Sequence, residues 1–163
     1  MDVFLKNGHV VYAEDGHFRV ERRDLYIKDG KISDGYPEGG SMHEINCEDK
    51  VIMPGLVNAH HHIYSTLSKG IPCETPFNNF LGNLENLWWR LDRSLTEEDM
   101  VLSTALTMDE CLKNGVTTVF DHHISVPFIE NSLSKMAEVF DKYGVQGALA
   151  FEVSDRNGKD VFE

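Results

Sequence analysis

The chain of 163 residues is 41% hydrophobic and 26% charged, an ordinary globular composition that allows a substantial core. Its 15 basic and 27 acidic residues give a formal net charge of −12, which argues against nucleic acid and anionic membrane surfaces as partners. The sequence shows no apolar run long enough to span a membrane, no signal-peptide pattern and no C-x-x-C motif. We therefore expect a cytoplasmic protein with reduced thiols.

Residues 1–53 are expected to form short β-strands separated by turns, as part of a small β-sandwich. The pairs Asn7-Gly8, Asp15-Gly16 and Asp29-Gly30 are typical hairpin turns, because both residues of each pair tolerate positive φ. In this interpretation Asn7-Gly8 joins two separate strands. A loop rich in glycine and proline follows, with Gly35, Pro37, Gly39 and Gly40.

The stretch from residue 51 to 62 reads VIMPGLVNAHHH, an apolar run with a Pro-Gly corner that leads into three histidines. Side chains alternate along a strand, so His60 and His62 should share one face while His61 points to the other. Two imidazoles on one strand can bind one metal ion, although a catalytic site needs further ligands. The spacing alone is a weak motif, but α/β barrels place their chemistry at such carboxyl strand ends.

The next part of the chain, to residue 92, carries many aromatic residues. Residues 63–70 are expected to form a short helical turn that stops before Pro72. We expect residues 73–92 to be irregular. Their aromatic side chains could flank a planar substrate or pack against a neighbouring subunit or domain, and they are Phe77, Phe80, Trp88 and Trp89.

Two helix–strand pairs follow. Thr96 predicts the start of a helix that ends near Gly115, with an apolar stripe of Val101, Ala105, Met108 and Leu112, widened by Leu102 and Leu106. The β-branched run 116–120 predicts a strand covered on both faces, and it continues into Asp121-His122-His123. A second helix is expected from about residue 131 to 143 and a strand at 145–151.

Strands alternating with helices imply a parallel sheet with right-handed crossovers, so the fold class is α/β. Residues 54–163 supply three such units, whereas a closed (β/α)₈ TIM-like barrel takes about 250 residues. The pattern therefore predicts either a small open sheet or the first part of a larger barrel.

The combination of motifs resembles the amidohydrolase superfamily of metal-dependent hydrolases, in its aminohydrolase branch of deaminases and chlorohydrolases. The run HHHIYSTL together with VTTVFDHH is most similar to aminohydrolases associated with selenium metabolism, and the second strand also resembles that of enzymes that deaminate 8-oxoguanine. The motifs that carry the resemblance are Asp29-Gly30-Lys31-Ile32, Pro54 to Ala59, His60-x-His62 and Gly115-Val116-Thr117-Thr118.

The resemblance implies that this chain is the N-terminal part of such an enzyme, with His60 and His62 as metal ligands. The remaining ligands and the catalytic glutamate would come from later strands beyond Glu163, so we expect no catalytic residue in this chain, which alone would be inactive. At most one of His122 and His123 can face the barrel interior, where it would contact substrate or support the site; the alternative is that it packs under the loops. Asp121 is expected to orient a neighbouring imidazole.

The implied reaction is hydrolytic deamination of a nitrogen heterocycle by metal-activated water. Imidazole ligands favour Zn²⁺, with Fe²⁺ as the alternative. A cyclic-amide hydrolase with two metals and a non-catalytic fragment are the alternative interpretations. Expected partners are a small heterocyclic substrate and, for the full-length enzyme, further copies of itself.

Overall fold

A computed structural model describes residues 2–33, 35, 41–72 and 79–158. The chain forms two compact units, Met1–Pro54 and Gly55–Glu163, and each is described by itself. The expected loop residues Pro37, Gly39 and Gly40 lie outside the described residues, as do Phe77 and the rest of 73–78. No helix among the described residues is long and apolar enough to cross a membrane.

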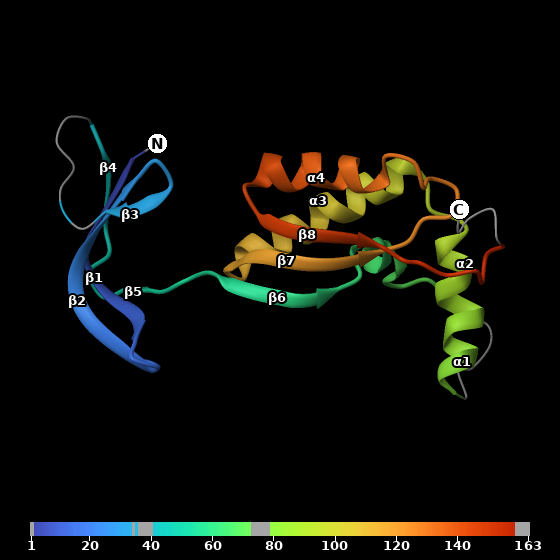
Figure 1. The fold of residues 1–163 in the computed structure, drawn as a ribbon, viewed down its shortest axis with the longest axis horizontal. Coiled ribbons are helices and arrows are strands. Elements are labelled where there is room, and N and C mark those ends of the chain that lie inside the picture. The colour runs from blue at the N-terminus through green and yellow to red at the C-terminus, as the bar shows by residue number, and fades with distance from the viewer. Residues whose placement is uncertain (1, 34, 36–40, 73–78, 159–163) are drawn as a thin grey trace. The chain divides into compact units, whose positions relative to one another are not determined.

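Within its described residues, the first unit is a five-stranded sheet in which β3, β2, β1 and β4 lie in that order and β5 also pairs with β1 (Figure 1). β2 is antiparallel to β1 and β3, whereas β4 and β5 run parallel to β1. Asp15 and Gly16 form the turn between β1 and β2, both with positive φ, as predicted. The strands are β1 (Val3–Glu14), β2 (His17–Lys28), β3 (Lys31–Ser33), β4 (His43–Asn46) and β5 (Val51–Ile52).

The predicted hairpin at Asn7-Gly8 is wrong, because β1 runs through this pair as one strand. The pair forms a bulge, seen as a register shift between Leu5 and Gly8. Asn7 has a φ of 63°, and its backbone N–H donates to Asp24 Oδ1 of β2 (2.8 Å). A β-carbon on Gly8 would lie 2.3 Å from a side-chain carbon of Ile52, so a close approach of β5 also requires the glycine.

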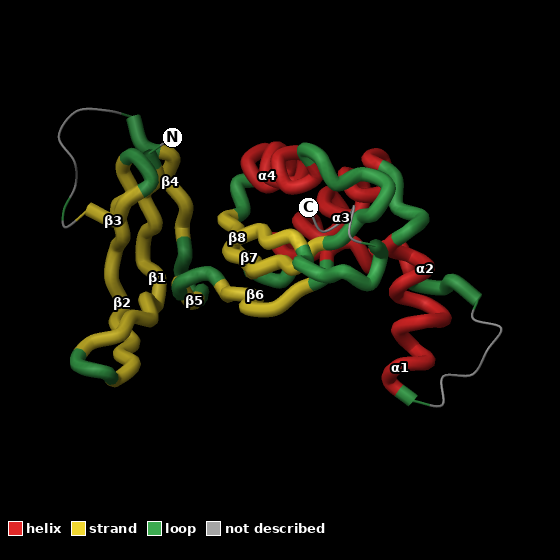
Figure 2. The backbone as a smooth tube through the Cα atoms, turned by 45° about the vertical axis from the view of Figure 1, so that its right-hand side comes forward, coloured by secondary structure: helices red, strands yellow, loops and turns green. Residues whose placement is uncertain are grey.

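The second unit has a parallel sheet in the order β6–β7–β8, with α3 and α4 on one side of it (Figures 1 and 2). This is the predicted alternation of strands and helices. The strands are β6 (Leu56–His61), β7 (Val116–His123) and β8 (Gln146–Phe151), and the helices are η1 (Ile63–Ser68, 3₁₀), α3 (Glu97–Lys113) and α4 (Ser132–Tyr143).

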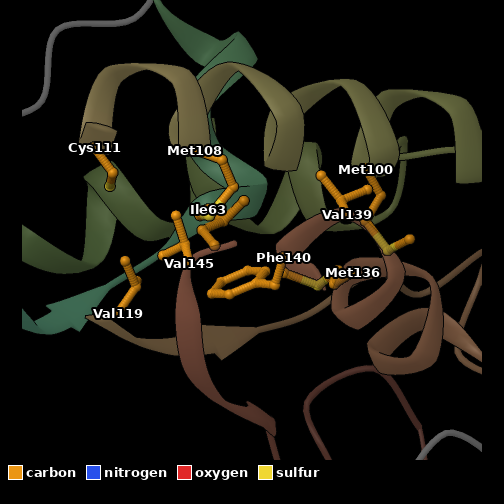
Figure 3. Close-up of a cluster of buried hydrophobic side chains, with 9 residues drawn as sticks. All are labelled: Ile63, Met100, Met108, Cys111, Val119, Met136, Val139, Phe140 and Val145. Atoms are coloured by element: carbon orange, nitrogen blue, oxygen red, sulfur yellow. The ribbon is translucent and has the colours of Figure 1, made fainter. Parts of the chain in front are cut away.

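The core of this unit lies between the helices and the sheet (Figure 3). Met100 and Met108 of α3 are fully buried there together with Ile63. The predicted stripe is only partly right: Leu102, Leu106 and Leu112 are exposed, and the smaller Ser103, Thr104 and Thr107 are buried instead. Thr104 satisfies its buried hydroxyl by donating to the Met100 carbonyl (2.8 Å).

The face of the sheet opposite to the helices is uncovered in the described residues. Val57 is 58% and Phe120 is 48% exposed. The expectation that β7 is covered on both faces is therefore wrong within the described residues, where helices cover one face of it.

Residues 80–92 are helical, which corrects the expectation of an irregular segment. They form α1 (Phe80–Asn83), one π-helical turn η2 (Leu84–Trp88) and α2 (Trp89–Asp92) without interruption. Asn79 starts the helix, because its Oδ1 accepts a hydrogen bond from the Gly82 backbone N–H (2.7 Å). This segment lies beside the carboxyl ends of the sheet strands, which the arrowheads mark (Figure 1).

Candidate functional site

His60 and His62 come together at the carboxyl end of β6. Their rings are 4.8 Å apart, centroid to centroid, at an angle of 84°. His62 follows the last strand residue and precedes the first turn of η1. The expected pairing of these two side chains is therefore seen, on the strand end where barrels carry their chemistry.

A hydrogen bond fixes the ring of His62. Its Nδ1 lies 3.1 Å from the backbone carbonyl oxygen of His122, at the end of β7. A carbonyl oxygen only accepts, so Nδ1 carries the proton and a neutral His62 leaves its Nε2 lone pair free. This is the arrangement in which an imidazole is ready to bind a metal ion.

His122 lies next to His62, with ring centroids 5.3 Å apart. It is in register with Ala150 on β8, just as Phe120 is with Ala148. These side chains share the face without helices, where His60, His122 and Ala150 help to line a cavity of about 250 Å³. The side chain of His122 is half-buried, and its Nδ1 has no hydrogen-bond partner among the described residues.

Asp121 is buried below the histidine pair. Its Oδ1 accepts a 2.7 Å hydrogen bond from the backbone N–H of Ile63, the residue after His62, while Oδ2 has no partner among the described residues. Burial raises the pKa of this carboxyl to about 6, against the lowering effect of the Ile63 bond. Asp121 thus holds the backbone next to His62, and orientation of a neighbouring imidazole by this carboxyl stays a prediction.

His123 is fully buried on the helix side of β7. Ser125 donates its hydroxyl proton to the Phe128 carbonyl (2.5 Å), so it accepts from His123 Nε2 (2.9 Å). Burial, and secondarily the neighbouring His122, lowers the pKa of His123 to about 4. Of the two adjacent histidines, His122 is the one beside the metal-type pair and His123 is the one packed under the loops.

His61 is in register with buried Asp121. It lines a second cavity, of about 580 Å³, with Thr66 of η1 and Thr107 of α3. Burial lowers the pKa of His61, and the neighbouring histidines lower it further. A bulge in β6 between Asn58 and His61 produces this placement.

The two imidazoles are suited to be part of a metal site. His60 and His62 supply two imidazoles on one face, and one of them has its donor nitrogen selected by a hydrogen bond. Among the described residues, no group of three or more histidine, cysteine, aspartate or glutamate side chains is arranged to hold a metal ion. The pair thus needs donors from elsewhere to complete a coordination sphere.

Sequence reasoning missed a buried ion pair at the same end of the sheet. Arg156, after β8, donates from Nη2 to Asp92 Oδ2 (2.7 Å) and also contacts Glu152. Asp92 and Arg156 are 64 residues apart, and no local pattern marks either of them. Only the three-dimensional fold brings them together.

A parallel sheet with one helical layer and histidines at a carboxyl strand end is the arrangement of the first part of a TIM-like barrel. The guanine deaminase of E. coli has the same fold, with a TM-score of 0.75 over 99% of this chain and 39% of the enzyme, at 19% identity. The model of the "Amidohydrolase family" matches residues 51–162. The chain belongs to this family.

Named relatives are deaminases. The 5-methylthioadenosine/S-adenosylhomocysteine deaminase of Pyrococcus furiosus is 26% identical over 163 residues, which cover 99% of this chain and 36% of the relative. The 8-oxoguanine deaminase of Pseudomonas aeruginosa is 31% identical over 133 residues, or 77% of this chain and 29% of the relative. The chain therefore spans about a third of the length of the relatives that it matches.

Proposed function

We propose that the protein is an aminohydrolase that removes an amino group, as ammonia, from a nitrogen heterocycle. The names of the deaminase relatives support a purine-type substrate. One observation carries the proposal: His60 and His62 present a paired imidazole site at the carboxyl end of a parallel strand. In this proposal His60 and His62 are two ligands of a divalent metal, Zn²⁺ or Fe²⁺.

The residues of the candidate site have separate tasks in the proposed reaction. A bound divalent metal would supply the positive charge that makes water a nucleophile at neutral pH. His60 and His62 hold it, and the His122 carbonyl places the proton of neutral His62 on Nδ1, so that Nε2 is the nitrogen that can bind the metal. The His122 ring faces the substrate from the adjacent strand, where it can hydrogen-bond a ring nitrogen or carbonyl. Asp121 keeps the strand end in place through the Ile63 amide.

The metal assignment predicts a specific loss. In the complete enzyme, His60→Ala and His62→Ala should each lower the metal content of the purified protein, measured by elemental analysis, and abolish ammonia release from adenosine- and guanine-type substrates. Because the two residues share one site, the double variant should bind the metal at least as weakly as either single variant.

His61→Ala is the matched control, because it removes the adjacent imidazole on the other side of the strand. It should retain its metal. Unchanged metal content and turnover in the His60 and His62 variants would refute the ligand assignment. Metal loss in the variants without any deamination by the complete wild-type enzyme would leave the metal site standing and refute the reaction.

A further inference from the structure

The side chain of Arg156 joins two parts of the chain that lie far apart in sequence. Its Nη2 donates to Asp92 Oδ2 of α2 (2.7 Å), and its Nε lies 2.8 Å from Glu152 Oε1, directly after β8. Its guanidinium carbon also lies 5.5 Å from the ring centroid of Trp89. Arg156 thus binds a helix before α3 to the segment that follows the last strand.

This ion pair is buried, so the loss of either partner should be costly. The Asp92 side chain is 1% exposed, and those of Arg156 and Glu152 are 19% and 20% exposed. Burial raises the pKa of Asp92 to about 6, while Arg156 lowers it. Removing one partner of a buried ion pair leaves an uncompensated charge, so α2 can stay in this position at little cost only while Arg156 is present.

Two successive aromatic contacts connect the helical segment that Arg156 holds to His62. Trp88 lies edge-on to Tyr64, with ring centroids 6.3 Å apart, and Tyr64 lies 5.8 Å from the ring of His62. Tyr64 is buried, and the burial raises the pKa of its hydroxyl. Trp88 directly precedes α2 in the same helical segment, so the position of this segment determines whether Trp88 packs against the Tyr64 ring beside His62.

We propose that Arg156 is a positioning residue that latches the helical segment Phe80–Asp92 onto the carboxyl end of the sheet, through Asp92, and so fixes the Trp88–Tyr64 pair beside His62. The latch is a property of this chain alone. Its consequence for the reaction, a fixed aromatic wall for a planar heterocycle, rests on the proposed function.

The tryptophans allow a direct test, because Trp88 and Trp89 are the two tryptophans of the chain and both belong to the latched segment. In Arg156→Ala, acrylamide quenching of tryptophan fluorescence should rise roughly twofold and the emission should shift to the red, since the segment opens locally. Arg156→Lys keeps the charge but loses the planar fork, so it should fall between the wild type and Arg156→Ala.

A second variant separates the latch from general unfolding. Asp92→Leu combined with Arg156→Met replaces the ion pair by apolar side chains of similar size, so quenching should return toward the wild-type value. The matched control is Lys113→Ala, which removes an exposed ion pair with Asp109 (2.6 Å) on α3 and should leave the quenching unchanged. Circular dichroism identifies variants that fail to fold.

Wild-type quenching in folded Arg156→Ala and Arg156→Lys would overturn the latch. A quenching rise in Lys113→Ala as large as in Arg156→Ala would also overturn it, because the effect would then not be specific. This readout needs no turnover and no metal. Failure of the His60 and His62 experiment would thus leave the latch untouched, and the reverse also holds.

Discussion

Two buried or half-buried imidazoles in the second unit use opposite ring nitrogens for their hydrogen bonds. His62 donates from Nδ1 to a backbone carbonyl, which leaves Nε2 as the nitrogen that can bind a metal ion. His123 donates from Nε2 to Ser125 and keeps its remaining nitrogen inside the protein. The same residue type is therefore a candidate ligand in one place and a packed, neutral side chain in the other, and the partner of each ring makes the difference.

His123 gives a prediction for the pH dependence of stability. Its pKa in the folded protein, about 4, lies below the ordinary value of 6.5. Between these values the unfolded chain binds a proton that the native state does not, so the free energy of unfolding falls as the pH falls from 6.5 to 4. His123→Gln keeps an amide donor for Ser125 but cannot titrate. Its free energy of unfolding should therefore fall less than that of the wild type over this pH range, by up to roughly 3 kcal/mol.

Urea denaturation of both proteins at several pH values measures the difference. The comparison is needed because Asp121, with a pKa raised to about 6, acts in the opposite direction: it favours the native state as the pH falls through 6. His17→Gln, which removes an exposed imidazole from β2, should follow the wild type. Parallel pH profiles for His123→Gln and the wild type would contradict a buried neutral His123.

If the complete enzyme binds a metal at His60 and His62 as proposed, Asp121 should affect the metal affinity without touching the metal. Asp121→Ala removes the acceptor for the Ile63 amide, so the strand end that carries His62 loosens, and we expect the metal affinity to fall by roughly 10–100-fold. Asp121→Asn keeps an acceptor oxygen and should recover most of the affinity, which competition with a chelating dye measures. Equal losses in both variants would show that the carboxylate charge matters and not the hydrogen bond.

At the scale of elements, the sequence predicts best what is decided locally. The start of α3 was predicted from Thr96, and the observed capping box confirms it, with Thr96 Oγ1 accepting from the Asp99 N–H and Asp99 Oδ2 from the Thr96 N–H. Asn7-Gly8 misled because the same residue pair suits a hairpin and a bulge. Pairing with β2 along nearly the whole of β1 decides between them, and that pairing is not local.

The candidate site divides in the same way. Alternation along one strand is enough to place His60 and His62 together, and the resemblance of motifs supplies the chemistry. The sequence could not distinguish His122 from His123, because that choice depends on which face of β7 the helices cover. Nor could it reveal Asp92 and Arg156, whose contact depends on the whole path of the chain between them.

The capping box itself can be measured. Thr96→Ala removes the acceptor for the first turn of α3 and should lower the free energy of unfolding by about 1 kcal/mol, whereas Thr96→Ser should retain most of it. Hydrogen bonds from Thr96 lower the pKa of the Asp99 carboxyl. That pKa should therefore rise toward its usual value in Thr96→Ala, as followed by NMR titration. An unchanged Asp99 pKa would mean that the capping box does not persist in solution.

At the scale of the whole chain, one face of the parallel sheet is uncovered in the described residues. The helices bury one face, while Val57 and Phe120 on the sheet remain about half exposed. The sheet order β6–β7–β8 also leaves β6 and β8 as edges within the described residues. Apolar faces and unpaired strand edges favour association, and relatives that are nearly three times as long have additional chain that can cover both.

The 163-residue chain by itself should therefore associate with other copies in a concentration-dependent way, which light scattering detects. Val57→Glu and Phe120→Glu place a charge on the uncovered face and should shift the distribution toward monomers, because burying an unpaired carboxylate between copies is unfavourable. Leu102→Glu is the matched control, since Leu102 is exposed on the outer side of α3. A monodisperse wild-type monomer with a cooperative melt would show instead that this chain is stable with the face open to water.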